Sequence, residues 1–404
     1  MSKRAVITGL GVVSPIGIGI DAFWRAATSG ESGIGPITKF DTSEYKVHIA
    51  GEVRSFEPVK PIYAQYLPLL GEQAQFVLSA TSMALRDAGV TIGDCDPSRV
   101  GVVIGNLYGE PRLLETHVRT SITAGIKGID PESIFAYPYT GLSSIVSSEH
   151  QIRGPSETIF AACSSGNIAI ARACDLIKMD VADIVIAGGV ESTSQAVFSH
   201  FHELRLLAPE LCQPFDKNRK GLVVAEGAGI VVIQSLESAL RQGRKIYAEI
   251  AGYGMSCDAH HPSSPHPNGA GIASAMIAAL SDAQLRPEDI GYISAHGTGT
   301  RMNDKIETRA IEQLFENRDD LLVSSIKSMI GHSMGASSAI EAIACCMVLD
   351  DQIVPPTINY YDPDPECDLN YVPNESTEAS VNICMNNSLG FGGINASVIL
   401  RAVR

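Results

Sequence analysis

Cys163 stands between a short β-prone run, residues 157–160, and a segment with helical spacing, residues 166–178. The residues around it are small, so we expect a sharp turn from strand to helix. At such an elbow the first helical N–H groups and the positive end of the helix dipole would lower the pKa of a thiol and could stabilise an oxyanion. The stretch therefore indicates either a reactive nucleophile or a buried cysteine, and it does not by itself decide between them.

Two histidines occupy comparable positions further along the chain. His296 directly follows the apolar run 290–295, and His332 comes shortly after the apolar run 321–325. One such histidine is more often structural than catalytic. Two histidines and one cysteine at equivalent strand ends favour a shared catalytic site.

The elements that must position these residues recur in two halves. Buried strands alternate with amphipathic helices, first at 5–9, 21–29, 71–89, 100–105, 166–178, 184–189 and 227–233. The order then repeats at 246–254, 271–283, 290–295, 321–325, 337–349 and 396–400, with a glycine-rich turn expected at 387–395. We interpret the repetition as a duplication into halves 1–244 and 245–404, with strands between helical layers, although any α/β chain alternates in this way.

Bulk composition narrows the class of protein. The 404 residues are 45% hydrophobic and carry a net charge of −15, which argues against nucleic acid as a partner. No apolar run reaches the length of about 18 residues that a membrane helix needs. Nine cysteines without paired spacing indicate reduced thiols and a cytoplasmic location, with no metal site. Gly9-Leu10-Gly11 is a weak dinucleotide fingerprint, because the third glycine is missing.

Four ordered motifs resemble the β-ketoacyl-acyl-carrier-protein synthases, in particular the type II elongating branch and the ketosynthase subunits of type II polyketide systems. They are Ala161-Ala162-Cys163-Ser164-Ser165, His296-Gly297-Thr298-Gly299-Thr300, Lys327-Ser328-Met329-x-Gly331-His332 and Gly390-Phe391-Gly392-Gly393-x-Asn395. The resemblance spans essentially the whole chain. It implies the thiolase fold, a five-layered αβαβα sandwich of two pseudo-symmetric halves, and a dimer.

The resemblance also implies a reaction and a role for individual residues. Cys163 would hold an acyl group, and His296 and His332 would stabilise the enolate formed when malonyl-carrier protein loses CO₂, in a decarboxylative Claisen condensation without a cofactor. Lys327 and Glu341 would support the histidines. The N–H groups of Cys163 and Phe391 would form an oxyanion hole, Phe391 would gate the acyl pocket, and Thr298 and Thr300 would bind the carrier's pantetheine arm.

Departures from the family pattern concern the acyl pocket and the docking of the carrier. Tyr108 replaces part of a glycine-rich turn, and Tyr137 falls where the pocket meets the dimer partner, which suggests an unusual acyl chain and specialised polyketide or polyene assembly over fatty-acid synthesis. Residues 61–76 lack the usual basic cluster for the acidic carrier protein. The alternative docking residues are Arg205, Lys217, Arg219 and Lys220.

Two other functions stay open at this point. A thiolase acts on coenzyme A substrates with a second cysteine near the C-terminus, and Cys384 precedes the last glycine turn without lying in it. A chain-length factor is a non-catalytic partner that generally lacks the cysteine. This chain keeps Cys163, so it resembles the active subunit, working as a homodimer or as a heterodimer with such a partner.

Overall fold

The computed structural model describes residues 3–59, 70–131, 133, 141–316 and 319–403. Most strands of this part form one large mixed sheet with a regular order. From one edge to the other the order is β11-β10-β14-β15-β9-β1-β8-β7-β5-β6. The central strands β1 (Ala5–Ser14) and β9 (Ala248–Cys257) pair antiparallel over a short register that joins Val6 to Glu249 and Ile7 to Ala248. The sheet thus consists of two halves that meet at one narrow contact.

The two halves repeat the same strand order. In the first half, β5 lies parallel to β6 and β7, while β8 runs antiparallel to β7 and β1. In the second half, β10 lies parallel to β11 and β14, while β15 runs antiparallel to β14 and β9. The bounds are β5 (Val100–Gly105), β6 (Ser156–Ile159), β7 (Ile184–Glu191), β8 (Gly227–Ser235), β10 (Tyr292–Ser294), β11 (Leu322–Ser324), β14 (Ile383–Gly390) and β15 (Ile394–Arg401). The pseudo-symmetry predicted from the sequence is confirmed, whereas the division between residues 244 and 245 stays a prediction.

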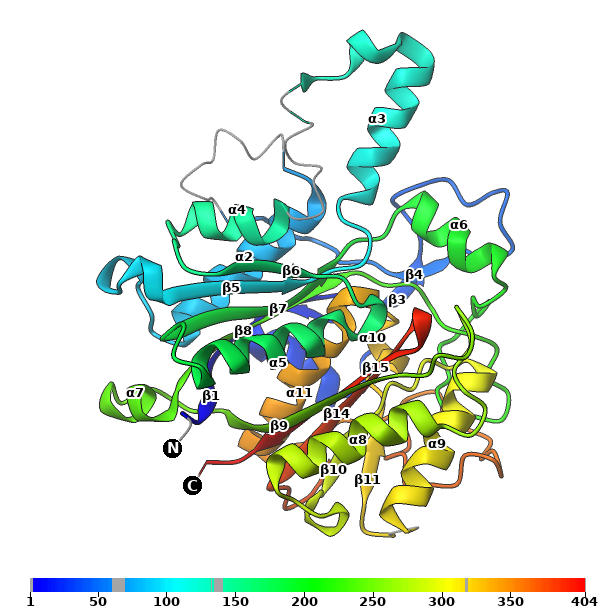
Figure 1. Cartoon of the computed structure of the whole chain (residues 1–404). Coiled ribbons are helices and arrows are strands. Elements are labelled where there is room, and N and C mark those ends of the chain that lie inside the picture. Colours follow the sequence, from blue (N-terminus) through cyan, green and yellow to red (C-terminus); the bar gives the residue numbers. More distant parts are fainter. Residues whose placement is uncertain (1–2, 60–69, 132, 134–140, 317–318, 404) are drawn as a thin grey trace.

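Helices cover both halves and fill the space between them (Figure 1). The helices α5 (Ser165–Lys178) and α11 (Ser337–Asp351) pack on each other in the middle, where Gly166 lies so close to α11 that an added Cβ would be 2.6 Å from the Ala339 nitrogen. The helix α2 (Glu72–Asp87) covers β1 and β8 on one outer face, and α8 (Ala270–Ala283) covers β9 and β15 on the other. The layers therefore alternate as helix, strand, helix, strand, helix.

The remaining elements are short or peripheral. Figure 1 shows α3 (Pro111–Ala124) projecting away from the sheet. The others are β2 (Gly17–Ile18), α1 (Ile20–Thr28), β3 (Ile34–Pro36), β4 (Ile49–Gly51), α4 (Gly141–Glu149), α6 (Gln195–Glu203), α7 (Leu236–Arg241), α9 (Arg301–Phe315), α10 (Lys327–Ile330), β12 (Ile353–Val354) and β13 (Thr377–Glu378), with single 3₁₀ turns between them. Within the described residues, no helix is long and apolar enough to span a membrane.

Three glycine-containing stretches show what the sequence pattern alone does not resolve. Gly9 and Gly11 do not form a turn but lie inside β1, where an added Cβ on Gly11 would be 1.9 Å from the Ala80 carbonyl oxygen of α2. β9 likewise continues through Gly252 and Gly254. The glycine turn expected at 387–395 is present but shorter, residues 391–393, because β14 extends to Gly390 and β15 begins at Ile394. In β1 and β9 the glycines permit a helix to pack closely on the sheet. The sequence pattern does not distinguish this role of glycine from its role in a turn.

Candidate active site

Cys163 lies on the predicted elbow between β6 and α5. The turn is tight because Ala162 adopts a positive φ of 50°, a conformation that costs a non-glycine residue about 1–2 kcal/mol. Hydroxyl groups hold it in place: Ser165 Oγ accepts a hydrogen bond from the Ala161 N–H at 2.9 Å and donates to the Ala162 carbonyl at 2.7 Å. Ser338 of α11 donates to the Cys163 carbonyl at 3.3 Å. The surroundings thus fix a strained conformation, as is common at functional sites.

The loop that carries His296 is shaped by two buried carboxylates of α9. Glu307 accepts hydrogen bonds from the backbone N–H groups of His296 and Gly297 at 2.8 and 2.9 Å. Asp304 accepts from the N–H groups of Thr298 and Gly299 at 3.1 and 3.2 Å. These carboxylates therefore position the backbone of the loop.

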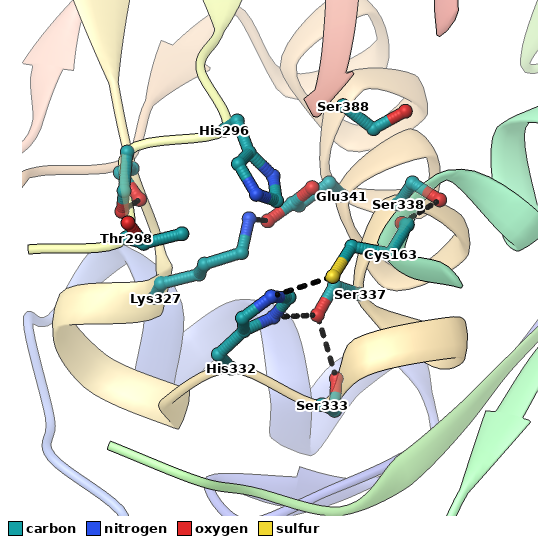
Figure 2. A network of polar contacts seen from close by, with 12 residues as sticks. Cys163, His296, Thr298, Lys327, His332, Ser333, Ser337, Ser338, Glu341 and Ser388 are labelled. Atoms are coloured by element: carbon teal, nitrogen blue, oxygen red, sulfur yellow. Dashed lines mark hydrogen bonds and ion pairs between the residues drawn. The ribbon is translucent and has the colours of Figure 1, made fainter. Parts of the chain in front are cut away.

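His332 sits between α10 and α11, and both nitrogens of its ring have a partner. Nε2 lies 3.1 Å from Sγ of Cys163, and Nδ1 lies 2.8 Å from Oγ of Ser337 (Figure 2). The ring of His296 packs edge-on against that of His332 with 5.2 Å between centroids. Nδ1 of His296 has no hydrogen-bond partner within the described part of the chain. The structure therefore brings the three predicted residues together. Hydrogen-bond partners hold the His332 ring on both sides, whereas the His296 ring is less constrained.

Burial controls the protonation of all three groups. It lowers the pKa of both imidazoles well below the usual range, helped by the positive charge of Lys327, so both rings are neutral. Burial also raises the pKa of the Cys163 thiol to about 12, although Lys327 and the N–H groups of Phe391 and Cys163 oppose the shift. The lowered thiol pKa expected from the helix N-terminus was therefore wrong in direction, because desolvation outweighs the favourable groups.

Lys327 and Glu341 form an ion pair, and both side chains are completely buried (Figure 2). The Lys327 charge acts on Cys163, His296 and His332 alike. The second carboxylate oxygen of Glu341 has no partner among the described residues. Within this pair, Lys327 places a positive charge near the thiol, where anionic states would develop.

The Phe391 loop closes the site from the second half of the chain. Gly392 and Gly393 have positive φ values of 81° and 75°, which glycine adopts at no steric cost. The Phe391 N–H lowers the pKa of the Cys163 thiol, so it lies on the side of the loop that faces the sulfur. The Phe391 ring lies against Phe201 of α6, with 5.9 Å between centroids. The N–H groups of Phe391 and Cys163 are thus both directed toward the position of the Cys163 sulfur.

A cavity of about 340 Å³ opens from the Cys163 thiol toward the surface. Cys163, His296 and His332 line its inner end, and the hydroxyl groups of Thr298 and Thr300, 2.9 Å apart, line its wall. Its lining also includes the cations Arg205, Lys220 and Arg301, together with Phe391. The sequence had not suggested Arg301. The cavity is therefore a channel with a nucleophile at one end and a lining that carries these cations and the carboxylate of Asp258.

The four residues predicted for carrier docking separate in the structure. Arg205, Lys217 and Lys220 are exposed. Arg219 is buried and bonds to Asp364 and to the carbonyl groups of Asp216 and Arg301. Its assignment to the docking surface was wrong, because the Asp364 carboxylate and two backbone carbonyl groups of this chain already pair with its charge.

Tyr108 lies beside the site, in an apolar cluster that also contains Phe201, Met334 and Phe391. Burial raises the pKa of its phenol. A buried carboxylate that the sequence did not reveal, Glu191, accepts hydrogen bonds from the Leu107 and Tyr108 N–H groups at 3.0 and 3.3 Å. Tyr137 lies outside the described residues.

Cys163, His296 and His332 also have the donor atoms of a zinc site, and these atoms lie within 4.8 Å of one another. They form the one such group found in the described part of the chain. The charge of Lys327 faces the same three side chains, which disfavours a bound cation.

Comparison with known proteins covers the whole chain. The model of the β-ketoacyl synthase N-terminal domain matches residues 2–239, and that of the C-terminal domain matches residues 247–361. The 3-oxoacyl-[acyl-carrier-protein] synthase 2 of Coxiella burnetii is 39% identical over 99% of both chains. The enzyme of that name from Synechocystis is 38% identical over 99% of this chain and 98% of its own.

Solved structures give the same result. The ishigamide ketosynthase/chain length factor is 39% identical with a TM-score of 0.96, and each chain is covered completely. A ketosynthase from the AntDE:AntF complex, a type II polyketide synthase with its acyl-carrier protein, is 32% identical with a TM-score of 0.92, again over all of both chains. The mixed sheet and helical layers described above are therefore those of the ketosynthase structures.

Proposed function

This chain belongs to the β-ketoacyl synthase family, and we propose on that premise that Cys163 holds an acyl group for condensation with malonyl-carrier protein. The enzyme is a condensing acyltransferase. The observation that carries the assignment of roles is the meeting of the Cys163 thiol with two neutral imidazoles and two backbone N–H groups at the end of one channel.

In the first half-reaction, Sγ of Cys163 attacks the thioester carbonyl of an acyl carrier. The N–H groups of Cys163 and Phe391 stabilise the oxyanion of the tetrahedral intermediate, as their convergence on the sulfur position supports. The carrier thiolate leaves, and the thiol proton of Cys163 passes through an imidazole to it. A covalent acyl-enzyme remains.

In the second half-reaction, malonyl-carrier protein loses CO₂. The electron pair of the broken C–C bond forms an enolate, whose oxygen accepts hydrogen bonds from His296 and His332. Neutral imidazoles suit this role because they place donors at the developing charge. The enolate carbon attacks the acyl group, the C–S bond breaks, and Cys163 leaves as a thiolate that takes up one proton from solvent. The β-ketoacyl product stays on the carrier.

A coupled assay tests the function directly. The purified chain, an acyl-carrier protein and malonyl-carrier protein should release CO₂ and produce a β-ketoacyl-carrier in equal amounts. Replacement of both carriers by coenzyme A thioesters should lower the rate strongly. Equal rates with coenzyme A alone would contradict a carrier-dependent synthase and favour a thiolase-type enzyme.

The structure offers a specific argument against the thiolase alternative. Cys384, which precedes the last glycine turn in the sequence, is buried in β14, and its thiol contacts the Cys345 carbonyl of α11. It does not line the channel that contains Cys163. Cys384 therefore cannot serve as the second reacting thiol that a thiolase needs.

Thr298 and Thr300 are proposed to bind the pantetheine arm, and exposed Arg205, Lys217 and Lys220 to attract the acidic carrier protein. Arg205 and Lys220 lie in the lining of the channel, which supports this placement. The overall charge of −15 would repel an acidic partner, so a local cationic surface is needed. The reduced cysteines support a cytoplasmic reaction.

Tyr108 is proposed to limit the acyl pocket, so Tyr108→Gly should favour longer chains. Loss of its ring opens space beside Phe201 and Phe391. We expect kcat/KM for a long acyl carrier, relative to a short one, to rise at least about tenfold, since a few methylenes in an apolar pocket carry this much discrimination. Acyl carriers of graded length measure the ratio. Tyr361→Gly, at an exposed tyrosine, is the control, and an unchanged ratio in Tyr108→Gly would contradict the pocket assignment.

The projecting helix α3 supports the proposed dimer. Leu114, Val118 and Ile122 form an apolar stripe at a spacing of four residues, and their exposed fractions are 36%, 49% and 78%. Such a stripe is normally covered in a soluble assembly. We propose that a second subunit of this fold, either another copy or a chain-length factor, covers it.

The substitution Val118→Asp together with Ile122→Asp should therefore convert the assembly to monomers. Light scattering after size-exclusion chromatography measures the mass. The control is Thr116→Asp, which adds a charge on the opposite side of the same helix. A wild-type monomer, or a double variant that stays dimeric at low micromolar concentration, would contradict the assignment of this stripe. A stable, active homodimer of the purified chain would rule out an obligatory chain-length factor.

A further inference from the structure

Ser337 is a buried hydroxyl that the reaction outlined above does not use. It stands at the first position of α11, and Oγ lies 2.8 Å from Nδ1 of His332 (Figure 2). Oγ of Ser333 lies 3.3 Å behind it. Ser333 and Ser337 are both fully buried, so their hydroxyl groups have no access to bulk water. The three groups form a short chain that ends at the ring whose other nitrogen faces Cys163.

The number of protons available to Ser333, Ser337 and His332 determines which group donates in each of these hydrogen bonds. If Ser333 donates to Ser337 and Ser337 donates to Nδ1, both hydroxyl protons are used. If Nδ1 carries the ring proton instead, it donates to Ser337, which must then donate to Ser333. The Ser333 proton would have no acceptor among the described residues, since Ser337 is its single side-chain partner. The first direction leaves the thiol proton of Cys163 without an acceptor instead, because Nε2 then donates to Sγ. An S–H group is a much weaker donor than a hydroxyl, so it costs less to leave unpaired and the first direction is favoured.

We propose that Ser337, backed by Ser333, holds His332 in the tautomer that carries its proton on Nε2 and so fixes this nitrogen as a hydrogen-bond donor for the condensation step. The inference rests on the proposed function and adds a positioning residue to it. The neutral ring needs this tautomer, because only an Nε2–H can donate to an enolate oxygen in the channel. His296 contrasts with it, since Nδ1 of that ring has no hydrogen-bond partner among the residues that the structure describes.

The two half-reactions then depend on Ser337 to different extents. A ring that already carries a proton on Nε2 cannot accept the thiol proton there during acyl loading. The thiol proton of Cys163 therefore passes to His296 and then to the carrier thiolate that leaves, so the number of protons is conserved in the loading step. Loss of the Ser337 hydroxyl should therefore slow condensation and leave loading nearly unchanged. A purely structural defect would slow both steps together.

The kinetic test compares Ser337→Ala, Ser337→Thr and Ser397→Ala. Ser397 is an equally buried serine whose hydroxyl bonds to Asn387, away from the channel lining, so it controls for the loss of a buried hydroxyl. Loading is followed by intact-protein mass, and condensation by a single turnover from preloaded acyl-enzyme. We expect Ser337→Ala to slow condensation about 10- to 100-fold, the range typical for loss of an outer hydrogen bond to a functional histidine. Ser337→Thr, which keeps the hydroxyl, should recover most of the rate.

A spectroscopic test needs no substrate. In ¹⁵N-histidine-labelled wild-type enzyme, the signal of His332, assigned by its loss in His332→Ala, should show a protonated Nε2 and an unprotonated Nδ1. A proton on Nδ1, or equal slowing of loading and condensation in Ser337→Ala, would overturn the inference. If the wild type forms no acyl adduct, the proposed function fails instead, and the tautomer measurement still decides the role of Ser337.

Discussion

His332→Ala is expected to lower the rate of carbon–carbon bond formation by about 10²- to 10³-fold, the usual cost of removing one donor from a developing oxyanion. The variant removes the Nε2–H group that lies beside Sγ of Cys163. Acyl loading should continue, since the N–H groups of Cys163 and Phe391 remain. Rapid-quench measurement of acyl-enzyme formation and of CO₂ release separates the two steps.

The matched control is His150→Ala, which removes another largely buried histidine, away from the channel. It should leave both steps close to the wild-type rates. Equal loss of loading and condensation in His332→Ala would show that the ring serves the thiol rather than the enolate, and the division between the two half-reactions would be wrong.

Cys163→Ala is expected to abolish condensation, by at least about 10⁴-fold, because no other group can hold the acyl chain. The same variant keeps both histidines and the Lys327–Glu341 pair. Slow release of CO₂ from malonyl-carrier protein should therefore persist, with acetyl-carrier protein as the product. Product analysis by mass spectrometry distinguishes this uncoupled decarboxylation from complete loss of activity, which would indicate that the thiol is also needed for the second step.

The sequence was sufficient for the parts of the fold that depend on periodicity. Apolar runs located β5 to the residue, and helical spacing located α5 and α11 to within two residues. Repetition of these elements predicted the two pseudo-symmetric halves. Cys163, His296 and His332 each follow the end of a strand. Because equivalent strands of the two halves meet in the middle of the sandwich, the sequence also predicted that these three residues share one site.

Other features depend on contacts between distant segments, which a sequence pattern does not contain. Gly11 permits the approach of α2 to β1 rather than a turn. Arg219 looks like a surface cation, yet Asp364 and two carbonyl groups surround it. The high pKa of the Cys163 thiol results from burial by both halves of the chain. Ser337 lies only five residues after His332, so a hydroxyl at the start of the following helix was a signal available in the sequence.

The central claim is that Cys163 carries the acyl group during the reaction, and the mass of the intact protein tests it most directly. After incubation with acyl-carrier protein, the wild type should gain the mass of one acyl group, and malonyl-carrier protein should remove it. Cys257→Ala, which removes an exposed thiol near the Phe391 loop, should gain the same mass. Cys163→Ala should gain none, and an acyl adduct that persists in Cys163→Ala would contradict the account.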